Sequence, residues 1–185
     1  GFIFRRLTGE MCDDDFASCT PGGAGTELNQ AIYSQRDAIF RGGEFQFQWD
    51  VAPMGSGLFG IDGQYDFVRA TFTDGSNVPR IPPQRIGGGV YWRDANWLMR
   101  VNLLHAFAQN SIAANETTTP GYDNLRAQVS YTRSFKNDPS GIKQFTVGIN
   151  GDNLLNQDMR NAVSFTKNEV LLPGRTVRLF ASVRF

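Results

Sequence analysis

Arg175-Thr-Val-Arg-Leu-Phe-Ala-Ser-Val-Arg-Phe185 is the stretch of sequence that decides the fold class of this chain. Apolar residues alternate in it with polar ones: Val177, Leu179, Ala181, Val183 and Phe185 against Thr176, Arg178, Ser182 and Arg184. A period of two residues is typical of a β-strand with one apolar and one polar face. The stretch ends on an aromatic residue, whereas a soluble domain more often ends in a polar, frayed tail. It therefore predicts an amphipathic strand with an apolar side to cover.

The same alternation recurs along the whole chain and predicts an all-β fold, an antiparallel meander of eight strands. The best example is Phe45, Phe47, Trp49 and Val51 against Glu44, Gln46, Gln48 and Asp50. The predicted strands are Gly1–Gly9, Ala31–Val51, Leu58–Phe72, Gln84–Arg93, Trp97–Gln109, Tyr122–Phe135, Phe145–Gly151 and the terminal stretch.

The connections between these strands alternate in length. Three are short and rich in turn-forming residues: Ala52–Gly57, Asp94–Asn96 and Lys136–Gly141. Four are long and polar: Glu10–Gln30, Thr73–Pro83, Asn110–Gly121 and Asp152–Gly174. Short turns on one side and long loops on the other are typical of outer-membrane barrels, in which the turns are periplasmic. Aromatic residues beside the short turns (Trp49, Trp92, Trp97 and Phe135) fit an interfacial girdle.

Composition excludes two other classes of protein. Lys and Arg total 18 and Asp and Glu total 18, so the net charge shows no basic excess for nucleic acid. No apolar run approaches the ~18–20 residues of a membrane helix. No Gly-x-Ser-x-Gly, His-Glu-x-x-His or phosphate-binding glycine loop occurs, so no catalytic residue is predicted.

Four segments carry a resemblance to a known family. They are Pro79-Arg-Ile-Pro-Pro-Gln-Arg-Ile-Gly-Gly-Gly89, Asn115-Glu-Thr-Thr-Thr-Pro-Gly-Tyr122, Gly151-Asp-Asn-Leu-Leu-Asn-Gln-Asp-Met-Arg160 and Leu172-Pro-Gly-Arg-Thr176. Together they resemble the carboxyl-terminal part of TonB-dependent outer-membrane receptors, and Arg36–Glu44 is similar to a preceding strand of that family. These motifs are most similar to those of the branch associated with zinc and haem uptake.

The resemblance implies a location in the bacterial outer membrane and the uptake of a scarce nutrient, such as a metal, haem or a metal chelate. It implies a barrel of about 22 strands, an amino-terminal plug domain with a TonB box, and energy from the TonB complex. It implies no cofactor and no enzymatic step. Because the chain starts in mid-strand, residues 1–185 are expected to be the carboxyl-terminal segment of such a barrel, without the plug and the earlier strands.

The phase of the alternation assigns side chains to the two faces of the predicted sheet. Residues expected to face lipid are Phe47, Val129, Val147, Leu179, Ala181 and Val183. Polar residues expected to face the lumen include Gln46, Gln128 and Ser130. Charges facing a lumen need water or a partner, so the lumenal charged residues are candidate plug contacts: Glu44, Asp62, Asp66, Arg100, Arg126, Arg178 and Arg184.

Other candidate sites lie outside this pattern. Cys12 and Cys19 share a loop-like stretch and are predicted to form a local disulfide, with free thiols or a metal site as alternatives. Asp13, Asp14 and Asp15 are either a solvated loop or ligands for a hard cation. His105, the one histidine, falls where the alternation drifts, so its face is open: it is either a metal ligand in the lumen or at the rim, or an ordinary interfacial or lumenal side chain.

The sequence alone leaves two alternative functions. A self-contained eight-stranded barrel with a structural or adhesive role is possible because eight strands can close. An outer-membrane barrel enzyme is disfavoured because no nucleophile and base are recognisable. The self-contained barrel requires a ladder between Phe2–Leu7 and Val177–Phe185. The hypothesis of a receptor segment predicts an open sheet without that ladder.

Overall fold

The computed structural model describes residues 2–8, 10–12, 19–21, 27–33, 36–114, 116–136 and 141–185, and up to residue 33 only the course of the backbone. It is built from β-strands. These are β1 (Phe2–Thr8), β2 (Glu10–Cys12), β3 (Cys19–Pro21), β4 (Glu27–Tyr33), β5 (Ala38–Met54), β6 (Gly57–Phe72), β7 (Arg85–Arg93), β8 (Trp97–Ala106), β9 (Tyr122–Ser134), β10 (Gln144–Asp152) and β11 (Thr176–Arg184). Within the described residues, no helix has the length and apolar character needed to cross a bilayer.

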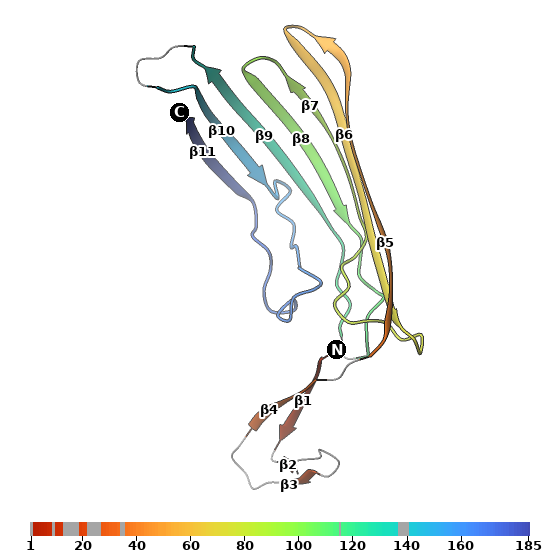
Figure 1. Ribbon diagram of the computed structural model, residues 1–185. Helices are drawn as coiled ribbons and strands as arrows, with labels where there is room; N and C mark the ends of the chain where they lie inside the picture. The colour runs from red at the N-terminus through yellow and green to blue at the C-terminus, as the bar shows by residue number, and fades with distance from the viewer. Residues whose placement is uncertain are drawn as a thin grey trace.

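Strands β5 to β11 form one antiparallel sheet in sequential order, β5-β6-β7-β8-β9-β10-β11. The turns β5–β6 and β7–β8 and the carboxyl end lie at one end of this sheet, and the connections β6–β7, β8–β9 and β10–β11 lie at the other (Figure 1). The all-β meander is therefore confirmed, and so is the segregation of short and long connections for the described connections of this sheet. The predicted connection Glu10–Gln30 and turn Lys136–Gly141 lie partly outside the described residues. The two outermost strands, β5 and β11, each have one ladder edge without a partner among the described residues.

The predicted count of eight strands in this sheet is wrong, because the sheet has seven. β1 pairs with β4, in a separate two-stranded sheet that is not hydrogen-bonded to the others. The predicted strand Ala31–Val51 is divided accordingly: Ala31 to Tyr33 belong to β4, and β5 begins at Ala38. The alternation of polar and apolar residues did not show this division, because it does not determine with which other strand each half of a long strand pairs. As predicted by the hypothesis of a receptor segment, no ladder joins β1 to β11 in the part of the chain that the structure describes.

The register confirms the predicted division into two faces. Directly opposed residues of an antiparallel ladder point to the same side. Val147 is opposite both Ala181 and Tyr131, and Asn150 is opposite both Arg178 and Gln128. One irregularity occurs in the sheet, a bulge at Val51 between Asp50 and Ala52. It lies next to a short turn, where it does not disturb the alternation of the rest of β5.

The apolar face is exposed over its whole width, since large side chains on it lack a covering layer. Trp49 is 64% exposed, Val177 64% and Leu179 78%. Such a continuous apolar surface would drive association in water, whereas in a bilayer it is the surface that lipid covers. Near the short turns, Trp92 donates its Nε1–H to the carbonyl oxygen of Met54 at 2.9 Å.

The turn between β7 and β8 is held by the carboxylate of Asp94. Its Oδ1 accepts hydrogen bonds from the backbone N–H of Trp97 at 2.7 Å and of Asn96 at 2.8 Å. These two bonds, with a third from the Ser56 hydroxyl, hold the pKa of Asp94 below its usual value. The turn is therefore a capped Asx-type turn, as expected for a tight hairpin.

The long connections at the opposite end contact one another. The backbone N–H of Arg80 donates to Glu116 Oε1 at 2.8 Å, and Asn77 Nδ2 donates to the carbonyl oxygen of Ile112 at 3.0 Å. Asn153 is fully buried, and its Nδ2 donates to Gln157 O and Pro173 O at 2.9 and 3.2 Å. The first two bonds join the connection after β6 to the connection after β8, and the bonds of Asn153 hold together the connection after β10.

Candidate functional site: the polar face of the sheet

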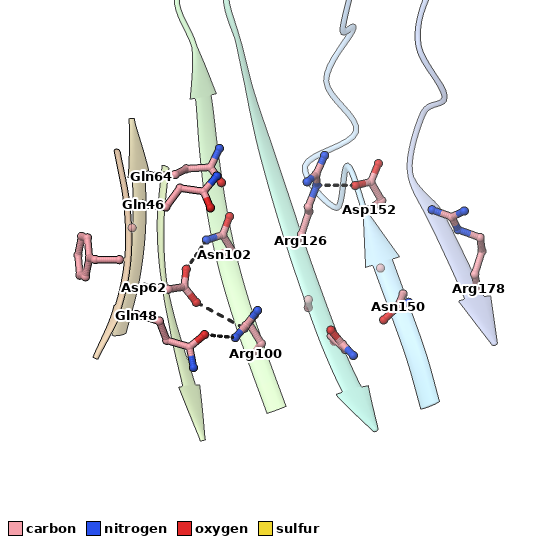
Figure 2. Close-up of a pocket in the computed structure, with 15 residues that line it drawn as sticks. Gln46, Gln48, Asp62, Gln64, Arg100, Asn102, Arg126, Asn150, Asp152 and Arg178 are labelled. Carbon is pink, nitrogen blue, oxygen red and sulfur yellow. Dashed lines mark hydrogen bonds and ion pairs between the residues drawn. The ribbon is translucent and has the colours of Figure 1, made fainter. Parts of the chain in front are cut away.

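The polar face carries a hollow of about 830 Å³ to which six of the seven strands contribute. Alternate residues of each strand point into it because the ladder keeps opposed residues on one side. Figure 2 shows amide and charged side chains side by side on this face. The polar side chains that line the hollow are Gln46, Gln48, Asp62, Gln64, Arg100, Asn102, Arg126, Gln128, Asn150, Asp152 and Arg178.

The first charge cluster is centred on Asp62 of β6 and Arg100 of β8. Arg100 Nε lies 3.4 Å from Asp62 Oδ2, and a second guanidinium nitrogen donates to Gln48 Oε1 at 3.2 Å. Asn102 Nδ2 donates to Asp62 Oδ1 at 2.8 Å (Figure 2). The Asp62 side chain is 16% exposed and that of Arg100 35%. The two opposite charges thus compensate each other within the wall.

The second cluster joins Arg126 of β9 to Asp152 at the end of β10. Arg126 Nε lies 2.7 Å from Asp152 Oδ1, a charge-assisted contact across the ladder. Asp152 was predicted as the first residue of a loop, so its partnership with Arg126 was missed. The register of the ladder explains the pair: Ala127 is directly opposite Gly151, so Arg126 and Asp152 stand opposite each other, and the sequence alone carries no signal for this register.

Arg178 of β11 differs from both clusters. It lines the same hollow, and its guanidinium makes no hydrogen bond or ion pair with any residue that the structure describes. Its ladder partner Asn150 has a covered Oδ1 atom without a hydrogen-bond partner. One uncompensated positive charge therefore remains at this side of the hollow.

Toward the long connections, the face carries two further acidic residues. Glu44 Oε1 accepts a hydrogen bond from Gln46 Nε2 at 2.7 Å, and Asp66 Oδ1 lies 2.9 Å from Arg85 Nε. Arg85 was not among the predicted site residues, although it stands directly opposite Asp66. Five of the seven predicted lumenal charges are thus bonded within the sheet. The other two, Arg178 and Arg184, have no side-chain partner among the described residues.

Near the short turns, the polar face includes a buried tyrosine that sequence reasoning missed. Tyr91 is 2% exposed, and its hydroxyl donates to Asp50 Oδ1 at 2.6 Å. Arg93 donates to Asp50 Oδ2, also at 2.6 Å, and the Arg100 guanidinium lies 5.4 Å from the centre of the Tyr91 ring. The signal available in the sequence was the alternation of Tyr91 with Trp92, which assigns the two rings to opposite faces.

His105 points away from this hollow. It is directly opposite Ile86 and Asp123 on the apolar side, and its Nδ1 lies 2.7 Å from Asp123 Oδ1. The Phe107 ring contacts the imidazole edge-on, with centroids 4.6 Å apart. Within the described residues, no group of three His, Cys, Asp or Glu side chains could hold a metal ion.

Two other sites predicted from the sequence, the aspartate cluster and the cysteine pair, lie in the amino-terminal part of the chain. Asp13, Asp14 and Asp15 lie outside the described residues. Cys12 and Cys19 stand directly opposite each other in the β2–β3 ladder. That register is compatible with the predicted disulfide, which stays a prediction.

A comparison with known families agrees with this geometry. Residues 12–154 match the family described as TonB dependent receptor-like, beta-barrel. The matched part covers β5 to β10 and therefore most of the polar and apolar faces described above. Proteins of this family act in TonB-dependent transport at the bacterial outer membrane and are transporters, not enzymes. The chain belongs to the TonB-dependent receptor β-barrel family.

Proposed function

We propose that this chain forms part of the barrel wall of a receptor that takes up a metal, haem or a metal chelate. In this proposal the apolar face meets lipid and the polar face meets the receptor's own amino-terminal plug domain. The plug in turn receives energy from the TonB complex. No covalent chemistry is involved, since the wall only binds and guides.

The observation that carries the proposal is the contrast between Arg178 and the other charges of the hollow. Asp62 compensates Arg100, and Asp152 compensates Arg126. Arg178 is left with a full charge and donors that are not used within the described residues. A guanidinium that loses water on docking needs an acceptor, preferably a carboxylate that it can hold with two hydrogen bonds. We therefore expect an acidic side chain or a backbone carbonyl of the plug to contact Arg178.

The paired charges support a plug that can move. Asp62 and Arg100 already bind each other, so a plug sliding past them does not have to break strong ion pairs. A wall with few unsatisfied charges holds its occupant through a few specific contacts and many weak polar ones. Such a surface suits a domain that must shift during each transport cycle.

The class of nutrient rests on the resemblance of the motifs to the branch associated with zinc and haem uptake. The described wall contributes no metal-binding cluster, and His105 lies on the opposite face. Ligands for a metal or a metal chelate are therefore expected outside this part of the wall, on the plug or on other loops.

Uptake by whole cells tests the nutrient. Cells that carry the complete receptor and a deletion strain are supplied with zinc, haem or a ferric chelate, with and without a functional TonB complex. We expect TonB-dependent accumulation of one of the three in cells with the receptor. If none of them accumulates in a receptor- and TonB-dependent way, the proposed nutrient class is wrong.

Charge reversal tests the plug contact. Arg178→Glu in the complete receptor should reduce the rate of uptake several-fold, because it places an anion where the plug is expected to offer an acceptor. Arg178→Lys keeps the charge and serves as the matched control, with a smaller loss. Equal uptake by Arg178→Glu and the unaltered receptor, at equal amounts in the membrane, would argue against a plug contact at this position.

A further inference from the structure

Two arginines stand directly opposite each other on the apolar face of the sheet. Arg41 of β5 is the ladder partner of Arg69 of β6. They share the side of Phe45 and Tyr65, because the ladder is regular between these two pairs. Both side chains are exposed, and neither forms a hydrogen bond or ion pair with a residue that the structure describes.

This arrangement is unfavourable without a ligand. Like charges directly opposite each other in a ladder destabilise the sheet. Four other arginines of the sheet have an acidic partner, as Arg85 has Asp66 and Arg93 has Asp50, and no other pair of arginines stands directly opposed in the described ladders. At Arg41 and Arg69 two positive charges are brought together with no acid among the residues that line the adjacent cavity.

The pair lies at the border of the apolar band. The outward residues of β6 are apolar, aromatic or glycine from Phe59 to Phe67, and Arg69 is the next outward residue. A run of that length matches the about 9–11 residues with which a tilted strand crosses the hydrocarbon region. Since Arg69 lies toward the long connections, the pair is at the external rim of the bilayer, at the depth of lipid headgroups.

A cavity of about 750 Å³ adjoins the pair. Its wall contains Arg41, Arg69 and Phe67, together with Pro83 and Phe107 from the neighbouring connections. The cavity therefore combines two guanidinium groups and apolar and aromatic surface with neutral polar side chains, among them Asn77 and Gln109. This combination suits an amphiphile whose anionic head meets the guanidinium and polar groups and whose chains meet the apolar surface.

We propose that Arg41 and Arg69 bind the phosphate group of a phosphorylated lipid in the external leaflet. Its acyl chains lie along the apolar face beside Phe67 and Phe45. A guanidinium presents a planar fork of donors that matches phosphate oxygens, and it gives up water more readily than an ammonium group does. The bound phosphate offsets the repulsion between the two arginines, and the low polarity of the rim strengthens the contact.

Lipid binding to the complete receptor in mild detergent tests the proposal. Native mass spectrometry follows a titration with phosphatidic acid and, separately, with diacylglycerol of the same chains, which lacks the phosphate. We expect selective binding of phosphatidic acid, weakened at least about tenfold in the double variant Arg41→Gln, Arg69→Gln, because two charge-assisted contacts are lost. Arg133→Gln is the matched control, since Arg133 is also on the apolar side, opposite Phe145, but near the short turns.

Thermal stability provides a second test, in which the order of unfolding temperatures of the variant and the unaltered receptor should reverse when phosphatidic acid is added. In detergent without added lipid, Arg69→Gln should unfold at the same or a higher temperature than the unaltered receptor, because it removes like-charge repulsion. With phosphatidic acid present, the unaltered receptor should gain more and become the more stable of the two. Heat-modified migration on gels verifies that each variant is a folded barrel.

Three results would overturn the inference. One is unchanged binding of phosphatidic acid by the double variant, and another is equal loss in Arg133→Gln. The third is stabilisation by inorganic phosphate equal to that by phosphatidic acid, which would assign the pair to a free anion. Nutrient uptake does not enter any of these measurements, so their outcome is independent of the transport proposal.

Discussion

Gly60→Ala is the substitution whose effect the structure specifies most sharply. Gly60 of β6 is directly opposite Tyr91 of β7, and the far end of the Tyr91 side chain occupies the space where a Cβ atom on Gly60 would lie. A Cβ atom at Gly60 would overlap with Cζ and the hydroxyl of Tyr91 and would lie 2.7 Å from the carbonyl oxygen of Trp49. Carbon atoms in ordinary contact are about 3.5–4.0 Å apart, so one of these groups must shift.

The loss in the free energy of unfolding caused by Gly60→Ala depends on which neighbouring groups can shift to make room for the methyl group. The Tyr91 ring is 2% exposed and is held by its hydrogen bond to Asp50, so moving it also disturbs that bond. The carbonyl of Trp49 belongs to the ladder and cannot shift without bending β5. Inserting a methyl group into such a packed site costs about 1–3 kcal/mol in the free energy of unfolding. We expect the upper half of that range, since side chain and backbone are both affected.

Equilibrium unfolding of the complete receptor in urea and detergent, followed by tryptophan fluorescence, measures this cost. Gly88→Ala is the matched control, because a Cβ atom there would meet only Asp62 O at an ordinary 3.5 Å. In a Tyr91→Ala background the cost of Gly60→Ala should fall but not vanish, since the carbonyl of Trp49 remains. If Gly60→Ala and Gly88→Ala had equal effects, the proposed packing of Tyr91 over Gly60 would be refuted.

Three further predictions concern the two faces, the cysteines and the turn. Ala181→Arg on the apolar face should destabilise the barrel by about 2–4 kcal/mol if the site is near the bilayer midplane and by less near the interface, whereas Ser182→Arg on the polar face should change the free energy of unfolding little. Mass spectrometry of unreduced protein should find Cys12 bonded to Cys19, and two free thiols would contradict this; a Cα separation above about 7 Å would also exclude the bond. The lowered pKa of Asp94 means that its contribution to stability is present above the unfolded pKa and is lost as the pH falls through the folded pKa. Acid titrations of the unaltered receptor and Asp94→Asn should therefore diverge above pH about 4 and converge below it.

The sequence by itself determined the type of structure and the side on which most residues lie. Alternation is a local property: each residue of a strand points opposite to its neighbours, whatever the strand pairs with. The assignment of Leu179 and Val147 to one face and of Arg178 and Gln128 to the other therefore held across the sheet. The turn-forming composition of the short connections likewise determined where the chain reverses.

Only the tertiary structure decided which side chains meet. The partnership of Asp62 with Arg100 depends on the register of two ladders, and one residue of slip in either would have separated them. The same holds for Arg126 with Asp152, for Tyr91 over Gly60 and for the opposed Arg41 and Arg69. Residue types along a single strand carry no information on that register, because it is set by the pairing of strands distant in sequence and by the loops between them. For the same reason the sequence did not reveal that β4 pairs with β1 before β5 enters the seven-stranded sheet.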